Sequence, residues 1–97
     1  MKVVVGVIHF DILINGAFNL KEKRGYVKRL VLKIRNKFNV SAAEVGYQDL
    51  WQRTKIGVAV VGADTALVNS LIDKITDFVY ANGDFEVIDR EIEVISY

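Results

Sequence analysis

The sequence predicts an α+β sandwich with the element order βαββαβ. Three observations lead to it: the chain opens and closes with long runs rich in β-branched residues, two segments have apolar residues at helical spacing, and two shorter β-type segments lie between them. The length of 97 residues, with 52% hydrophobic and 26% charged, suits one domain with a single core, spanning residues 1–97.

The first element, residues 2–14, is predicted to be a long and mostly buried strand because β-branched residues dominate it. Side chains alternate between the two faces of a strand, so the residues divide into two sets. The set predicted to face the core is Val4, Ile8, Phe10, Ile12 and Ile14. The opposite face carries Val3, Val5 and Val7.

The second element is predicted to be a helix from residue 20 to about residue 38. Asn19 and Glu22 match a capping box, in which side-chain oxygens accept hydrogen bonds from free amides at the helix start. The following apolar residues recur at i, i+3, i+4, i+7 and i+11, which is the spacing of one helical stripe. They are Val27, Leu30, Val31, Ile34 and Phe38.

Residues 39–48 and 54–62 are predicted to form a hairpin whose turn lies around LWQ and contains neither proline nor glycine. Asp64 is expected to cap a second helix, which ends at a left-handed stop formed by Asn82 and Gly83. The apolar stripe of that helix is Leu67, Val68, Leu71, Ile72, Ile75, Phe78 and Val79. Residues 85–96 supply the last strand.

Two split β-α-β units pack as a ferredoxin-like sandwich, a four-stranded antiparallel sheet with both helices on one face and the first and third strands central. The helix-free face would show Val3, Val5 and Val7, and a contiguous apolar patch there favours a homo-oligomer formed by sheet-to-sheet packing. Two alternatives stay open: the last strand curls over this face, or the valines are tolerated singly. Glycines are expected where helices crowd the sheet, at Gly6, Gly57 and Gly62.

The charges are segregated although the net charge is only +1. Residues 21–37 hold eight of the thirteen basic residues and one acid, whereas residues 84–93 hold five acids and one arginine. Four of these cations, Lys21, Arg24, Lys28 and Arg35, fall on one flank of the first helix, while Arg29 and Lys33 point to the opposite flank. A helix start with free amides favours an anion such as a phosphate. The predicted RNA- or phosphate-binding residues are Lys21, Lys23, Arg24, Lys28 and Arg35. A solvated helix face is the alternative.

The expected partner of this flank is RNA or a ribosomal particle, bound mainly through backbone phosphates. Residues 54–62 contain no aromatic residue, and Phe10 has the parity of the core. Stacking of bases on the two central strands, as in an RNA recognition motif, is therefore not expected.

A second candidate surface is GYQDLWQRT, residues 46–54, which holds the one tryptophan of the chain. Tryptophan, tyrosine and arginine dominate interface hot spots, so the segment suits a protein-interaction module. The predicted partner-binding residues are Tyr47, Gln48, Trp51 and Arg53. Trp51 could instead close the core, and Asp49 could fix the turn or pair with Arg53.

Catalytic residues are not predicted. His9 and Asp11 share strand parity and could form an acid–base pair, but no residue stands in a nucleophile setting and no ligand cluster suits a metal. Cysteine is absent, and no apolar run is long enough for a membrane span. We therefore expect a cytoplasmic protein that is not an enzyme and has no cofactor, metal or membrane partner.

Two motifs, LKEKR at 20–24 and EVGYQDLWQR at 44–53, closely resemble those of the YlxP-like family of small bacterial proteins, a domain of unknown function. The resemblance runs from Val3 to about Ile88 and implies a ferredoxin-like fold. It supplies no catalytic set, and Tyr47 stands where many members have a histidine. Members are commonly encoded beside translation factors and a ribosome maturation factor, which implies a task near RNA or the ribosome.

Overall fold

The fold is a ferredoxin-like α+β sandwich, as the sequence predicts. A computed structural model describes residues 2–97 and contains the six expected elements in the expected order. The strands are β1 (Val4–Ile14), β2 (Ser41–Gly46), β3 (Arg53–Gly62) and β4 (Phe85–Ser96). The helices are α1 (Leu20–Lys37) and α2 (Thr65–Tyr80).

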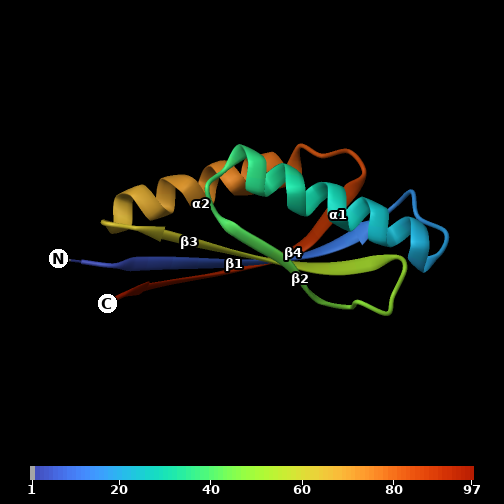
Figure 1. The fold of residues 1–97 in the computed structure, drawn as a ribbon, viewed down its shortest axis with the longest axis horizontal. Coiled ribbons are helices and arrows are strands. Elements are labelled where there is room, and N and C mark those ends of the chain that lie inside the picture. The colour runs from blue at the N-terminus through green and yellow to red at the C-terminus, as the bar shows by residue number, and fades with distance from the viewer. Residues whose placement is uncertain (1) are drawn as a thin grey trace.

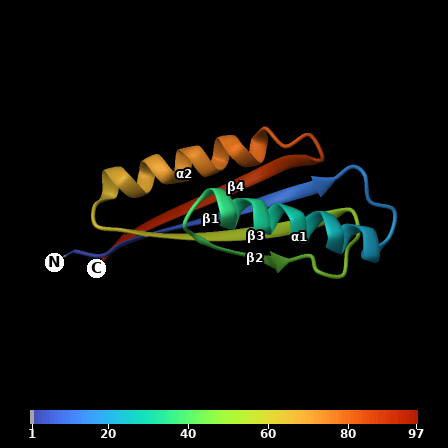
Figure 2. The same ribbon diagram turned by 45° about the horizontal axis from the view of Figure 1, so that its top comes forward.

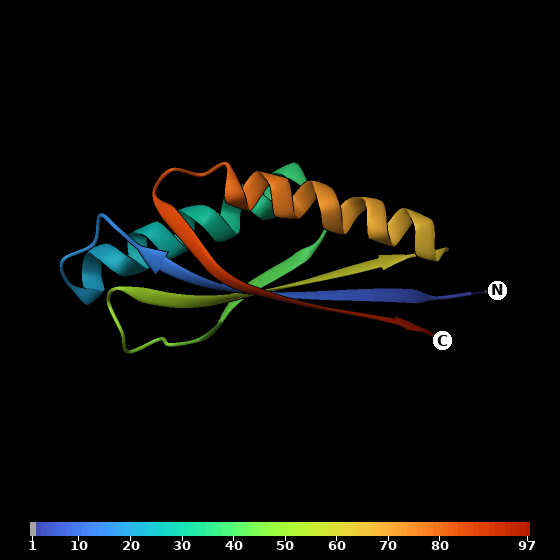
Figure 3. The same cartoon turned by 180° about the vertical axis from the view of Figure 1, so that it is seen from behind.

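The four strands form one antiparallel sheet in the order β2-β3-β1-β4, so β1 and β3 are central as predicted. Both helices lie on one side of the sheet (Figure 1), with α2 along β4 and β1 and α1 on the side of β2 and β3 (Figure 2). The other side, here called the uncovered face, carries no helix or strand of residues 2–97, as the view from behind also shows (Figure 3). Neither helix in this range is both long and apolar enough to cross a membrane.

The hydrophobic core lies between the sheet and the two helices. Burial alternates residue by residue along β1, and the predicted core-facing set from Val4 to Ile14 is buried. The stripe of α1 packs onto it through Val27, Leu30 and Ile34, with Val68 and the other buried residues of α2 completing the layer. The two-residue repeat of the strands and the 3.6-residue repeat of the helices therefore direct their apolar side chains into one core. The remaining side chains of each element lie on the outside.

Both predicted helix starts are confirmed. The side chain of Asn19 accepts a hydrogen bond from the backbone N–H of Glu22 at 2.9 Å, and the carboxylate of Glu22 accepts one from the N–H of Phe18 at 3.0 Å. The side chain of Asp64 likewise accepts one from the N–H of Leu67 at 2.7 Å. These bonds satisfy amides that have no partner within the helix.

The left-handed stop predicted at Asn82 and Gly83 is wrong. The residue after α2, Ala81, is right-handed, and no glycine among residues 2–97 has a positive φ. The chain leaves the helix through a local turn instead, because the side chain of Asn82 accepts a hydrogen bond from the N–H of Asp84 at 3.2 Å.

Two of the three glycines relieve crowding between α2 and the sheet, as predicted. A Cβ at Gly6 or Gly62 would lie 2.7 or 2.9 Å from a methyl group of Val68. Gly57 differs, since its Cβ would meet Val45 at 3.1 Å. The register of β2 against β3 shifts between Glu44 and Gly46, so Val45 bulges out and lies over Gly57.

The uncovered face carries the predicted valines. Val5 pairs in register with Val61 on β3 and Ile95 on β4, and Val7 pairs with Ala59. The alternative that the last strand curls over this face is wrong, because β4 pairs with β1 along its length and forms an edge of the sheet.

Candidate functional site

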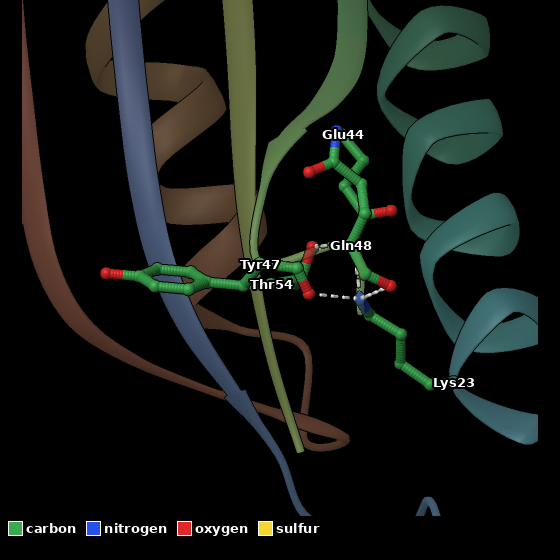
Figure 4. A network of polar contacts seen from close by, with 5 residues as sticks. All are labelled: Lys23, Glu44, Tyr47, Gln48 and Thr54. Carbon is green, nitrogen blue, oxygen red and sulfur yellow. Dashed lines mark hydrogen bonds and ion pairs between the residues drawn. The ribbon is translucent and has the colours of Figure 1, made fainter. Parts of the chain in front are cut away.

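Lys23 is completely buried, although the charge pattern placed it on the exposed flank of α1. Its ammonium nitrogen lies 2.7 Å from Oε2 of Glu44 and donates to the backbone carbonyls of Tyr47 at 2.9 Å and Gln48 at 3.3 Å (Figure 4). The ammonium thus donates two hydrogen bonds to backbone carbonyls and forms an ion pair with one carboxylate. The assignment of Lys23 to an RNA-contacting surface is therefore wrong.

The position of Lys23 follows from the helical repeat. Lys23 precedes Val27 by four residues and Ile34 by eleven, so it shares the direction of the core-facing stripe. Glu44 has the inward parity of strand β2, and Thr54 has that of β3. Three polar residues thus occupy core-facing positions on three elements, a sequence signal that points to a buried polar network.

Glu44 is the centre of this network, since its Oε2 atom also accepts a hydrogen bond from the hydroxyl of Thr54 at 2.6 Å. The Thr54 residue is fully buried, and the Glu44 side chain keeps 18% exposure. Every buried side-chain nitrogen and oxygen in the part of the chain described has a hydrogen-bond partner. A complete network of this kind offsets the cost of burying charge and holds its members in one arrangement.

The network fixes the turn between β2 and β3. Tyr47 has a φ of 58° and is the one non-glycine residue with positive φ in residues 2–97. A left-handed conformation costs a side-chain-bearing residue about 1–2 kcal/mol. The Tyr47 carbonyl accepts hydrogen bonds from both the Lys23 ammonium and the N–H of Leu50, at 2.9 and 3.0 Å, which stabilises the turn in this form.

The ring of Tyr47 lies across the uncovered face toward β1 (Figure 4). The guanidinium carbon of Arg53 is 4.4 Å from the ring centroid. The same guanidinium donates to both carboxylate oxygens of Asp11 on β1, at 2.9 and 2.7 Å. Arg53 therefore pairs with Asp11 and not with Asp49, and this pair holds its guanidinium over the Tyr47 ring.

This ion pair changes the acidity of Asp11. The hydrogen bond from Arg53 lowers the pKa of the Asp11 carboxyl below its ordinary value of 3.8, while partial burial acts in the opposite direction. The charges of Arg53 and Lys55 lower the pKa further. The same hydrogen bond raises the pKa of Arg53, so both groups are charged at neutral pH.

Trp51 lies outside the buried core and is 36% exposed. It lines a shallow hollow of about 330 Å³ together with Phe18 and residues at the end of β1. The hairpin residue Gln48 is also exposed and contributes its carbonyl to Lys23. Trp51 is therefore not one of the core residues and keeps solvent-exposed surface.

The remaining four predicted cations are exposed and are called the basic ridge: Lys21, Arg24, Lys28 and Arg35. Arg35 donates to the backbone carbonyl of Ala42 at 2.7 Å, which anchors this end of the ridge on β2. The ion pairs found among residues 2–97 are Lys23 with Glu44 and Arg53 with Asp11. No ridge cation pairs with an acid in that range, and the acidic strand β4 lies at the opposite edge of the sheet from β2.

The structure brings the two predicted surfaces to the same end of the molecule. Lys23 lies next to Arg24 in the sequence and contacts the turn that carries Tyr47. The start of α1 and the β2–β3 turn are both at the end opposite the two termini (Figure 1). The motifs at 20–24 and 44–53 thus meet in one buried network with an exposed surface on each side.

The structure does not join His9 and Asp11 as an acid–base pair. Both lie on the uncovered face as predicted, but Asp11 is bound to Arg53 and His9 stands in register with Glu91 on β4. The hollow beside His9 measures about 110 Å³. Residues 2–97 contain no group of three or more side chains able to hold a metal ion.

Comparison with known proteins connects the chain to a family. The sequence model of the family described as "Protein of unknown function (DUF503)" matches residues 5–92. The "Uncharacterized protein YlxP" of Bacillus subtilis (strain 168) is 37% identical over 89 residues, which cover 92% of this chain and 94% of that protein.

Two solved structures are similar at low identity. The de novo designed protein Foldit4 has 15% identity and a TM-score of 0.49, with 100% of this chain and 97% of that chain covered. LarC2, the C-terminal domain of a cyclometallase, has 16% identity and a TM-score of 0.35, with 100% and 58% covered. Neither similarity is high enough to support an argument about this protein.

Lys23→Met is expected to lower the free energy of unfolding by about 3–5 kcal/mol, because it leaves the partly buried Glu44 carboxylate without its ion-pair partner. The double variant Lys23→Met/Glu44→Leu should lose less unfolding free energy than the single variant, because no unpaired carboxylate remains. Urea denaturation followed by circular dichroism measures both. Lys28→Met on the exposed ridge is the control and should change stability by no more than about 0.5 kcal/mol. Equal stability of the two lysine variants would contradict a structural role for Lys23.

The Asp11–Arg53 pair should make stability depend on pH in the acid range. Because the folded pKa of Asp11 is below 3.8, its carboxylate stabilises the fold above that pH, and the contribution is lost as the pH falls through the folded pKa. Asp11→Asn should therefore be less stable than wild type at neutral pH, and the difference should shrink below about pH 4. Urea unfolding at several pH values tests this against Asp73→Asn, an exposed control on α2. If the loss of stability in Asp11→Asn does not change with pH, the Asp11–Arg53 ion pair is not the cause of that loss.

Proposed function

The chain belongs to the DUF503 family of proteins of unknown function. We propose that it is a non-enzymatic cytoplasmic protein that binds RNA through the basic ridge of α1. The RNA is free or part of a ribosome-associated particle. The observation that carries the proposal is that the four ridge cations are exposed and none pairs with an acid in residues 2–97.

The electrostatics of the ridge favour a polyanion. Its cations share one flank of α1, and the one acid among residues 21–37, Glu22, is engaged by the N–H of Phe18 at the helix start. Like charges along a helix repel, and cations near its N-terminus oppose the dipole, each by a few tenths of a kcal/mol. Phosphates along the ridge would remove both penalties, and four contacts to a single strand predict a slope of about −3 for log K against log salt.

Reversing two ridge charges tests the proposal. Arg24→Glu/Lys28→Glu should weaken RNA binding for every sequence and reduce the salt slope by about half, because two of four phosphate contacts are lost. Filter binding of a labelled oligoribonucleotide over a range of salt concentrations measures both quantities.

The matched control is Lys33→Glu/Lys74→Glu, which changes the net charge equally but lies on the other flank of α1 and on α2. It should bind RNA nearly as wild type does. If both double variants weaken RNA binding equally, the effect comes from net charge alone. If the ridge variant binds RNA as wild type does, the ridge is not the RNA-binding surface.

A second candidate function is self-association through the apolar half of the uncovered face. Val5, Val61 and Ile95 lie side by side in register, and Val3 next to them is 39% exposed. We propose a second copy as the partner, because this face carries Glu91 and Glu93 on β4 and the cation Lys55 on β3, which has no ion-pair partner in residues 2–97. A two-fold axis parallel to the strands would bring these opposite charges of two copies toward each other.

Val61→Lys should leave the protein monomeric, because it places a charge in the middle of the proposed contact. Val61 is 69% exposed, so the fold itself should tolerate the change. Sedimentation equilibrium compares its mass with that of wild type and of Leu67→Lys, a control at an exposed apolar residue of α2. A monomeric wild type would refute the self-association.

A further inference from the structure

The uncovered face carries an aromatic ring that comes from a turn and not from a strand. Strand β3 contains no aromatic residue and Phe10 of β1 is buried, so the two central strands offer no exposed ring for base stacking. The β2–β3 turn supplies the missing ring, since Tyr47 lies across this face and contacts Arg53 of β3. The sheet therefore has one stacking surface where the strands alone offered none.

This ring is held in place before any ligand binds. Its backbone carbonyl is bound by the buried Lys23 ammonium, and the guanidinium against the ring is fixed by its double hydrogen bond to Asp11. A ring that is already ordered loses little entropy on binding. The left-handed backbone of Tyr47 is the kind of local strain that proteins keep at functional positions.

Tyr47 keeps solvent-exposed surface although Arg53 lies over its ring. The guanidinium of Arg53 occupies one side at 4.4 Å, yet Tyr47 remains 37% exposed. A flat group on the side opposite the guanidinium would extend the stack of guanidinium and phenol by one layer. Nucleobases stack on such aromatic surfaces in proteins that bind single-stranded nucleic acid.

The backbone of Tyr47 lies beside the turn of α1 that begins the basic ridge. Lys21 and Arg24 belong to the same turn of α1 as Lys23, whose ammonium contacts the Tyr47 carbonyl. An RNA strand with phosphates on the start of the ridge reaches the uncovered face by passing over the end of the edge strand β2. An aromatic or guanidinium group of a protein would also fit the ring, but the neighbouring unpaired cations favour a nucleic acid.

We propose that Tyr47, backed by Arg53, is the stacking site for one unpaired base of the RNA whose phosphates bind the basic ridge. The inference rests on the proposed RNA-binding function and adds to it a preference for single-stranded RNA over duplex. Tyr47 provides the ring, Arg53 and Asp11 position it from the sheet, and Lys23 positions it from the core.

Fluorescence anisotropy with labelled oligoadenylate, an abasic strand of equal length and an RNA duplex tests the site. Tyr47→Leu should weaken binding of oligoadenylate by about 5- to 140-fold, which corresponds to 1–3 kcal/mol for one stacked base. It should leave the abasic strand and the duplex unchanged, because neither offers an unpaired base. Tyr47→Phe, which keeps the ring, should bind oligoadenylate as wild type does.

The control is Tyr97→Leu, which removes an exposed tyrosine at the opposite end of the molecule and should have no effect. Equal weakening of all three ligands by Tyr47→Leu would overturn the stacking role. Unchanged oligoadenylate binding by Tyr47→Leu, with loss in Arg24→Glu/Lys28→Glu, would overturn the stacking site and leave the ridge intact. Absence of binding by wild type to all three ligands would overturn the ridge and the stacking site together.

Discussion

The buried ammonium of Lys23 joins the start of α1 to β2 and to the turn that follows it. A charge in the interior is tolerated only when every donor has an acceptor. Here the acceptors come from β2 and from the turn that follows it, at Glu44, Tyr47 and Gln48. The first helix, the edge strand and the hairpin turn are therefore tied together at one point, and that point joins the two sequence motifs that carry the family resemblance.

This constraint divides the cations of α1 into two groups with different tasks. Lys23 points inward and fixes the turn, whereas the four ridge residues point outward and have no acid to pair with in residues 2–97. The β2–β3 turn also positions Tyr47 over the sheet, where its ring contacts the guanidinium of Arg53 that Asp11 binds. One side of the network thus presents positive charge and the other side presents an aromatic ring, at the same end of the molecule.

The sequence predicts the fold well because two periodicities and two helix caps report directly on local geometry. It misassigns Lys23 when charge alone is counted, although the helical phase shared with Val27 and Ile34 places that residue inside. The partner of Arg53 depends on the register of β1 against β3, which pairs Leu13 with Arg53 and brings Asp11 close. The direction of the Tyr47 ring depends on one backbone angle beside a bulge. Sequence patterns carry no signal for the partner of Arg53 or for the direction of this ring.

Amide chemical-shift mapping by NMR during titration with a short single-stranded RNA locates the binding surface, because it reports on every part of the protein surface at once. We expect the shifts to concentrate at the start of α1 and at the β2–β3 turn, around Arg24 and Tyr47 together. The shifts at the opposite end of the molecule, where the two termini lie and Val5 pairs with Ile95, should remain unchanged. Shifts confined to that opposite end, or none at all, would contradict RNA binding by the basic ridge and Tyr47.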